Sequence, residues 1–265
     1  MADGARSEVS VALFMGGLDP SGGAGVLRDA VVASGLGVHP MAVPLAETIQ
    51  NGFACNAVLP PAADPLERLD SIVPHLAGTW GVKISMFQNS GLLHELLPKL
   101  CALAPTAAIW DTIQAPTAGA GLHSRDALVE AAGMLSGNGW VVSPNLPEAR
   151  LLADMPDSPA ESVADRLLEM GFAGVWIRGG HGSGATVRDL WCDGGGSAWL
   201  EPHPRLAGDP RGTGCTATAA WLAMRLNGAG PAEAAKGAVA YVRKAWAGLH
   251  SPGGAGRPTF PPRVP

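Results

Sequence analysis

Charged side chains are scarce in this sequence. Only 15% of its 265 residues are Asp, Glu, Lys or Arg, and the net charge is −5. No run of basic residues occurs, so the chain lacks the positive surface that nucleic-acid binding requires. Its apolar stretches are short and are interrupted by Gly, Pro or charge, which argues against a membrane span. We therefore expect neither nucleic acid nor a membrane among its partners.

Cysteine is equally sparse. The four cysteines, Cys55, Cys101, Cys192 and Cys215, show no C-x-x-C spacing, which argues against a disulfide framework and against a zinc site. Residues 1–10 are polar and lack the basic and apolar regions of a signal peptide. These absences predict a cytoplasmic protein with free thiols.

Apolar residues, by contrast, make up 47% of the chain, and Gly and Pro are frequent at 36 and 23 residues. A chain of this length and composition can bury one sizeable core, and no linker or internal repeat divides it. We expect a single domain over residues 1–265. Its ends, at about 1–8 and 251–265, are expected to be mobile, the second because it is rich in Gly and Pro.

Apolar runs of strand length alternate with amphipathic stretches of helical spacing. Strands are expected at 9–15, 38–45, 81–86, 107–111, 140–143 and 174–178, with a hairpin formed by 187–192 and 197–202. Helices are expected at 26–34, 65–76, 90–103, 125–135, 147–152, 158–170, 213–226 and 231–249. This alternation predicts an α/β fold with a largely parallel central sheet, in which ligands bind at the carboxyl ends of the strands.

The most informative segment contains Gly212, Thr213, Gly214 and Cys215 directly before a predicted helix. Glycines let the backbone approach a ligand closely, and the free N–H groups and positive dipole end of a helix attract phosphate. The same helix end favours the thiolate of Cys215, which can then accept a proton from a hydroxyl that attacks phosphorus. A glycine turn that caps a helix around a small buried cysteine accounts for the same residues.

A second glycine-rich segment, 16–25, follows the first predicted strand. It is not a P-loop, because no Gly-Lys-Ser/Thr sequence follows it. Its only carboxylate, Asp19, either forms the turn or hydrogen-bonds a substrate hydroxyl or ring nitrogen. Gln50 and Asn51, after the second strand, either offer an amide pair for similar contacts or form an ordinary polar loop.

Six segments along the chain together resemble the hydroxymethylpyrimidine/phosphomethylpyrimidine kinases of thiamine biosynthesis. The resemblance extends from about Val9 to about Trp246 and is carried by Asp19–Gly25, Gln50–Asn51, Val82–Lys83, Pro144–Ala149, Gly179–His181 and Gly212–Thr216. It implies a ribokinase-like fold, a three-layer sandwich with helices on both faces of the sheet, and a homodimer. It also implies ATP and Mg²⁺ as cofactors, and phosphorylation of a pyrimidine hydroxymethyl group and then of the resulting monophosphate.

The resemblance also implies roles for individual residues. It implies Gly212, Thr213, Gly214 and Cys215 as the anion hole, with Cys215 as the base; Gly17, Asp19, Gln50 and Met86 at the substrate; Asn145, Arg178, Gly180, His181 and Lys83 at the nucleotide; and Glu148 and Asp111 near the metal. Asn145 and Glu148 also fit an ordinary helix N-terminus, and His181 an ordinary loop histidine.

The chain departs from the family pattern around the expected substrate pocket. It has Ile84-Ser85 where the family usually has Thr-Gly, Thr112-Ile113 for Pro-Val, Thr117-Ala118-Gly119 in the flap, Arg211 for a common His, and its own sequence at 46–49. The anion hole is intact, so the kinase chemistry is better supported than the substrate. A pyridoxal-type vitamer kinase and a pyrimidine- or nucleotide-binding module without turnover are the alternatives, and the combination of Cys215, Asn145, Glu148 and Lys83 favours an enzyme.

Overall fold

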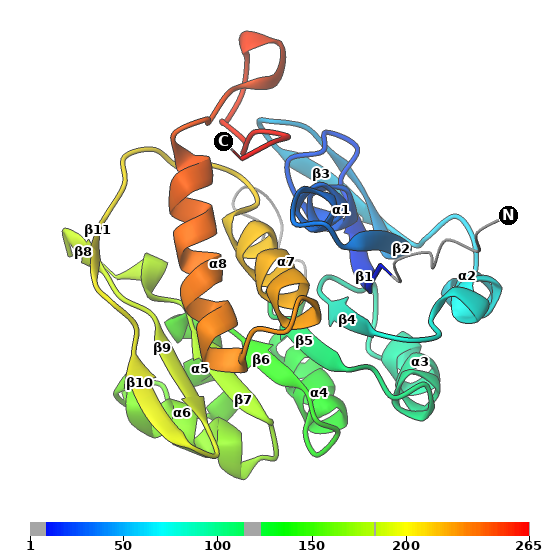
Figure 1. The fold of residues 1–265 in the computed structure, drawn as a ribbon, viewed down its shortest axis with the longest axis horizontal. Coiled ribbons are helices and arrows are strands. Elements are labelled where there is room, and N and C mark those ends of the chain that lie inside the picture. Colours follow the sequence, from blue (N-terminus) through cyan, green and yellow to red (C-terminus); the bar gives the residue numbers. More distant parts are fainter. Residues whose placement is uncertain (1–8, 114–122, 183, 265) are drawn as a thin grey trace, which may run out of the picture.

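A computed structural model describes residues 9–113, 123–182 and 184–264, and a nine-stranded sheet forms its centre (Figure 1). The sheet comprises β1 (Val11–Leu18), β2 (His39–Gln50), β3 (Cys55–Leu59), β4 (Trp80–Ile84), β5 (Ala107–Asp111), β6 (Val141–Ser143), β7 (Gly174–Ile177), β9 (Leu190–Asp193) and β10 (Gly196–Trp199). A separate ribbon pairs β8 (Thr186–Val187) with β11 (His203–Pro204). The strand order in the large sheet is β10-β9-β7-β6-β5-β4-β1-β2-β3.

Helices connect these strands and cover both faces of the sheet. They are α1 (Gly25–Gly35), α2 (Pro65–Ile72), α3 (Gly91–Ala102), α4 (Arg125–Leu135), α5 (Leu146–Ala153), α6 (Ala160–Glu169), α7 (Thr213–Leu226) and α8 (Pro231–Trp246), with 3-10 turns at Val73–His75, Gly179–His181 and Pro252–Gly254. Among the described residues, every helix is too short or too polar to cross a lipid bilayer.

The six central strands, from β2 to β7 in the spatial order, run parallel, whereas β3, β9 and β10 add antiparallel strands at the two edges. The expected hairpin is confirmed as β9 and β10. The strand β3 was not predicted, because its residues are half-exposed and show no clear apolar alternation. Its antiparallel pairing with β2 depends on a partner that is known only in the folded chain.

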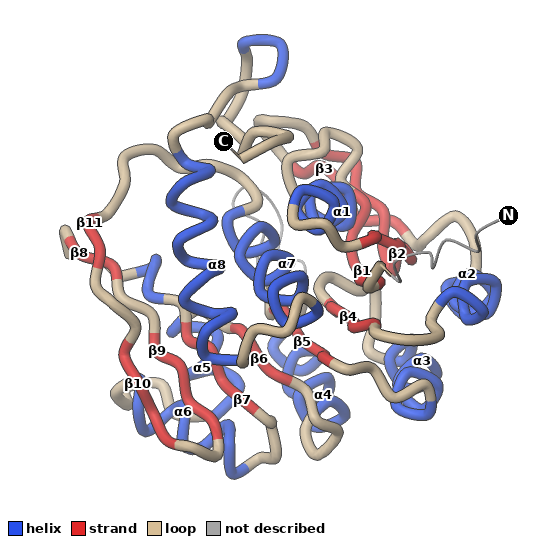
Figure 2. The backbone as a smooth tube through the Cα atoms, in the orientation of Figure 1, coloured by secondary structure: helices blue, strands red, loops and turns tan. Residues whose placement is uncertain are grey.

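Alternation along β1 shows why the sheet is covered on both faces. Ala12 and Phe14 pack with apolar residues of α1, α7 and α8, whereas Leu13 and Met15 pack in the second core with α2 to α6. All four side chains are buried, which is the pattern of a parallel strand between two helical layers. The helices lie on both sides of the sheet in Figure 2, and the expected three-layer, ribokinase-like α/β sandwich is confirmed.

The order of the strands positions a site. After β1, the chain first adds β2 and β3 on one side of it and then adds β4 to β7 on the other side. This reversal of the strand order creates a topological switch point beside β1. Loops after parallel strands all leave from the same edge, and ligands bind where their directions diverge. The residues that follow β1, β4, β5, β6 and β7 therefore meet at one edge of the sheet.

The C-terminal tail, for which we expected mobility, makes specific contacts in the structure. The backbones of His250 and Thr259 exchange hydrogen bonds, and the Arg28 guanidinium donates to the carbonyl oxygens of Phe260 and Pro261 at 3.1 and 2.9 Å. Phe260 is buried against the α7–α8 layer. The many Gly and Pro residues of this segment do not prevent the burial of Phe260, and the mobility of the segment stays a prediction.

Adjacent residues in α4 test the assignment of its buried face. Leu128 is fully buried and Val129 is 43% exposed. Leu128→Ala should lower the free energy of unfolding by about 2–5 kcal/mol, because it removes apolar contacts and leaves a cavity. Val129→Ala should change it by less than about 0.5 kcal/mol. Urea unfolding of both variants measures the difference, and equal effects would contradict this orientation of α4.

Candidate active site

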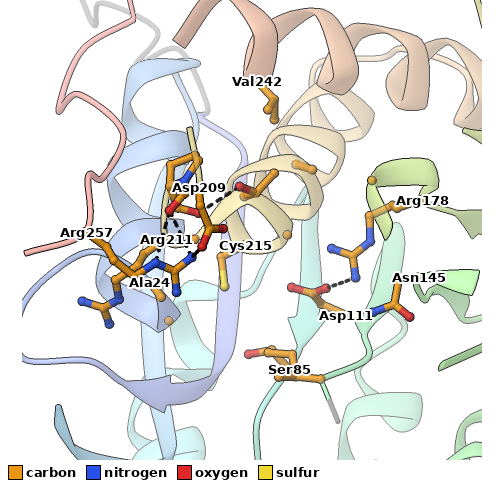
Figure 3. Close-up of a pocket in the computed structure, with 18 of the residues that line it drawn as sticks. Ala24, Ser85, Asp111, Asn145, Arg178, Asp209, Arg211, Cys215, Val242 and Arg257 are labelled. Atoms are coloured by element: carbon orange, nitrogen blue, oxygen red, sulfur yellow. Dashed lines mark hydrogen bonds and ion pairs between the residues drawn. The ribbon is translucent and has the colours of Figure 1, made fainter. Parts of the chain in front are cut away.

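A cavity of about 790 Å³ opens at the carboxyl edge of the parallel strands (Figure 3). Thirteen of the residues that the sequence singled out line it: Gly17, Asp19, Gln50, Met86, Asp111, Asn145, Glu148, Arg178, Gly180, Gly212, Thr213, Gly214 and Cys215. They come from both ends of the chain, so the tertiary fold brings the separate motifs into one site.

The two glycine-rich segments touch each other at the wall of this cavity. Gly212 has φ +77°, and a Cβ on it would lie 2.1 Å from the carbonyl oxygen of Gly23. Gly25 has φ +63°, and a Cβ there would lie 2.1 Å from the carbonyl oxygen of Gly17. Only glycine satisfies both the backbone conformation and the close contact. The start of α7 is thereby set against the loop after β1, and its first N–H groups are available to an anion.

Cys215 lies in the first turn of α7 and is 6% exposed. Burial raises the pKa of its thiol to about 11, although the nearby Lys83 ammonium and a backbone hydrogen bond from Gly25 act in the opposite direction. The sequence suggested that the helix N-terminus would favour a thiolate. The structure corrects this, because exclusion of water outweighs the positive groups, and the resting residue is a neutral thiol.

Lys83 does not reach the cavity, contrary to its expected place at the nucleotide. It is fully buried beneath the site, where its Nζ lies 2.7 Å from Asp29 Oδ1 and 3.3 Å from Asp111 Oδ2. Burial opposes its charge, but Asp29, Cys215 and Asp111 outweigh burial and raise the pKa of Lys83. Burial also raises the pKa of Asp29 to about 6 despite the adjacent ammonium.

Asp29 is a site residue that the sequence reasoning missed. It lies on the buried face of α1 together with Val26, Val32 and Ala33. A carboxylate at helical spacing among apolar residues was the available signal, because such a group is rarely buried unless it is paired.

Asp111 joins this buried charge pair to the cavity. Its Oδ1 lies 3.0 Å from Nη2 of Arg178, and Figure 3 shows the two side chains pointing toward each other. The Arg178 guanidinium crosses the start of α7, since a Cβ on Gly214 would lie 2.3 Å from its Nη1. Burial opposes the positive charge, but Asp111 and Glu148 outweigh it and raise the pKa of Arg178. A positive group therefore lies beside the N–H groups of α7.

Asn145 and Glu148 form the capping box of α5, as a helix N-terminus predicts. The Glu148 carboxylate accepts from the Asn145 backbone N–H at 3.0 Å and from the Thr112 hydroxyl at 2.7 Å. Thr112, one of the departures from the family pattern, thus holds the carboxylate in place. Because both capping residues also line the cavity, structural and functional roles coincide here.

On the opposite wall, Arg211 connects Asp19 with Gln50. Its Nη2 donates to Asp19 Oδ2 at 2.7 Å and to Gln50 Oε1 at 2.8 Å. Nearby, Met86 packs over Gly17, where a Cβ would lie 2.8 Å from the Met86 sulfur. The four residues expected at the substrate therefore gather on one side of the cavity.

The remaining predictions concern the departures from the family pattern and the two residues Gly180 and His181. Ser85 replaces the glycine that is usual in the family, and its side chain fills the space beside Gly16. A Cβ on Gly16 would lie 2.0 Å from the Ser85 hydroxyl, so the absence of a side chain at Gly16 makes room for Ser85. The carbonyl oxygen of Gly180 accepts from Arg205 Nη1 at 2.7 Å. The side chain of His181 and the flap residues Thr117–Gly119 lie outside the described residues.

Comparison with known proteins gives this arrangement a family. The family model described as phosphomethylpyrimidine kinase matches residues 19–259. This chain belongs to that family. The hydroxymethylpyrimidine/phosphomethylpyrimidine kinase of Bacillus subtilis is 30% identical over 241 residues, covering 88% of each chain. The kinase of the same name from Aquifex aeolicus is 30% identical over 240 residues, covering 89% of this chain and 93% of its own.

Solved structures with a similar fold support the architecture. The pyridoxal kinase of Staphylococcus aureus in complex with pyridoxal superimposes with a TM-score of 0.85 at 22% identity, over 97% of this chain and 94% of its own. The phosphomethylpyrimidine kinase of Clostridium difficile 630 gives 0.76 at 22% identity, over 90% and 99%. These likenesses confirm the ribokinase-like fold.

Alkylation tests the protonation state of Cys215. A pKa of about 11 leaves about one thiol in ten thousand ionised at pH 7. The iodoacetamide labelling rate of Cys215, followed by peptide mass spectrometry, should therefore rise about tenfold per pH unit between pH 7 and 9, because the thiolate is the nucleophile. The labelling rate of the exposed Cys101 is the control for the activity of the reagent at each pH. A Cys215 rate that has already levelled off by pH 7 would indicate a stable thiolate instead.

Proposed function

We propose that this protein is a cytoplasmic kinase that transfers the γ-phosphoryl group of ATP to 4-amino-5-hydroxymethyl-2-methylpyrimidine, to its monophosphate, or to both. One observation carries the proposal. The Cys215 thiol, at the N-terminus of α7, shares a cavity with the Asp111–Arg178 pair on one side and the Gln50 amide on the other. Phosphate-binding groups, a base and a ring-binding amide are thus combined in one site.

Each group has a role in phosphoryl transfer. When Cys215 is in its thiolate form, the substrate hydroxymethyl oxygen attacks the γ-phosphorus, its proton passes to Cys215 Sγ to give the thiol, and the bond from the γ-phosphorus to the bridging oxygen breaks to release ADP. The N–H groups of Thr213 to Cys215 and the Arg178 guanidinium stabilise the negative charge on the transferring group. Positioning and charge stabilisation provide most of the acceleration, so a small fraction of thiolate is sufficient. Turnover should consequently increase with pH above 7.

Asp111 and Glu148 are the residues that fit Mg²⁺. Asp111 Oδ1 is buried and forms the ion pair with Arg178 at the cavity, and carboxylate oxygens are the ligands that this ion prefers. The described residues contain no group of three or more His, Cys, Asp or Glu side chains arranged for a metal, which agrees with an ion held by one or two carboxylates and by substrate phosphates. When bound, Mg²⁺ would neutralise charge on the phosphates.

A pyridoxal-type kinase is the second candidate. Both rings carry a hydroxymethyl group, so the same transfer chemistry serves either. The observation that favours it is the contact between Arg211 and Gln50, which limits the hydrogen bonds that Gln50 offers to a ring.

An apolar patch supports a homodimer. Leu27 and Val31 on α1, and Ile49 and Leu59 on β2 and β3, are 36–53% exposed. The strand β3 forms one edge of the sheet, next to β2, and α1 lies beside these two strands (Figure 1). Clustered exposed apolar side chains favour association. We propose that a second copy of the chain covers this patch.

ADP release in the presence of ATP and Mg²⁺ tests the activity. Hydroxymethylpyrimidine, its monophosphate and pyridoxal are offered separately, and turnover with at least one pyrimidine is expected. Cys215→Ala should lower turnover by about a hundredfold or more while ATP binding persists, because the base is lost. Cys101→Ala, on the exposed side of α3, is the control. Near-normal turnover in Cys215→Ala would remove its proposed role, and ring binding without turnover in the unmodified protein would indicate a binding module.

Sedimentation velocity tests the dimer. Leu27→Glu places a charge within the patch and should shift the protein from dimer to monomer. Val129→Glu adds the same charge at a similarly exposed position on α4, on the other helical layer, and should leave the dimer intact. A wild-type monomer at micromolar concentration, or equal effects of the two variants, would contradict the proposed interface.

A further inference from the structure

The guanidinium of Arg211 donates three hydrogen bonds to side chains on the ring-binding wall. Its Nη2 donates to Asp19 Oδ2 at 2.7 Å and to Gln50 Oε1 at 2.8 Å, and its Nη1 donates to the Ser21 hydroxyl at 2.7 Å. The second oxygen of Asp19 accepts from the Ser21 backbone N–H and hydroxyl at 2.9 and 2.7 Å. Asp19 is 1% exposed, so its carboxylate acts first as the counter-ion of Arg211.

The surrounding backbone holds Arg211 in this position. Its N–H donates to the carbonyl oxygen of Pro258 in the tail at 2.9 Å. Its guanidinium lies against Gly23, where a Cβ would lie 3.2 Å from Nη1 and would crowd it. Arg211 also directly precedes Gly212, whose conformation is restricted by its own close contact. The guanidinium is therefore a fixed part of the wall, since both its backbone and its head group are held.

This placement determines which end of the Gln50 amide faces a ligand. A guanidinium offers only donors, so the group that meets Arg211 must be the amide oxygen of Gln50. The orientation of a glutamine amide is decided by its hydrogen-bond partners, and here the partner leaves one choice. With Oε1 engaged by Arg211, the Nε2 group is the end of Gln50 that remains for the cavity, which this residue lines.

We propose that Arg211 is a specificity-determining residue that makes Gln50 a hydrogen-bond donor to the substrate ring. The inference rests on the proposed function of the same site. A donor at this position selects rings with an acceptor, either a ring nitrogen or an oxygen substituent on the ring, and gains nothing from an exocyclic amino group. The enzyme should therefore tolerate loss of the 4-amino group from hydroxymethylpyrimidine, and the ratio of kcat/KM for the amino and desamino rings should stay below about tenfold.

Gln50→Glu tests the donor directly. The variant keeps an oxygen for Arg211 and replaces the Nε2 donor with a second acceptor of the same size, so the charged wall is retained. We expect kcat/KM for the desamino ring to fall by about tenfold or more, because the ring acceptor then faces a carboxylate. The KM for ATP should not change. Gln88→Glu, an exposed position outside the cavity lining, is the charge-matched control.

Arg211→Met provides the complementary test. Without the guanidinium, Gln50 can turn its oxygen toward the ring, and the preference for the amino ring over the desamino ring should rise by about tenfold. Removal of Arg211 leaves Asp19 buried without its cation and can destabilise the chain. The Gln50→Glu measurement decides the question in that case.

The outcomes separate this inference from the proposed function. A desamino kcat/KM that stays within twofold of wild type in Gln50→Glu would overturn the donor role, even in an active kinase. Ring binding by calorimetry that Gln50→Glu weakens, in a protein without turnover, would support the donor role and reject the kinase. A protein that binds neither ring would overturn both.

Discussion

The buried ammonium of Lys83 connects the elements on which the site depends. It extends from β4, lies between Asp29 of α1 and Asp111 of β5, and has the carbonyl oxygen of Cys215 in α7 at 3.5 Å. A buried charge without partners is costly, so these groups must come together when the chain folds. The position of Asp111 at the cavity and the start of α7 above it are consequences of that requirement.

The position of the N-terminus of α7 depends on a second contact, which is between backbones. Gly23 and Gly212 approach each other more closely than any side chain would allow, as do Gly17 and Gly25. The two glycine-rich segments lie about 190 residues apart in the sequence, yet their backbones are in direct contact because the glycines carry no side chains. Their glycines are therefore needed for fit between loops as well as for a possible approach of phosphate.

Two arginine–carboxylate ion pairs lie on the walls of the cavity. Arg178 lies beside the N-terminus of α7, and Arg211 lies on the opposite wall, each paired with a buried carboxylate. Pairing lets a guanidinium remain charged while water is excluded. The two arginines differ in their neighbours: Arg178 lies against Gly214 in the first turn of α7, whereas Arg211 donates to the amide oxygen of Gln50.

The sequence by itself determined much of this protein. Local patterns predicted β5, α4 and α7 with their observed bounds, because apolar periodicity and helix-start signals act over a few neighbouring residues. The motif resemblance also selected thirteen residues that line the cavity. It indicated which residues lie at the cavity, but it did not indicate their burial, their pKa or the orientation of their side chains.

Only the tertiary structure decided the state of those residues. The burial of Lys83, the raised pKa of Cys215, the orientation of the Gln50 amide and the packing of Phe260 all depend on neighbours distant in sequence. Desolvation and hydrogen-bond direction are set by what surrounds a group in space. For that reason they could not be obtained from residue types and spacing alone.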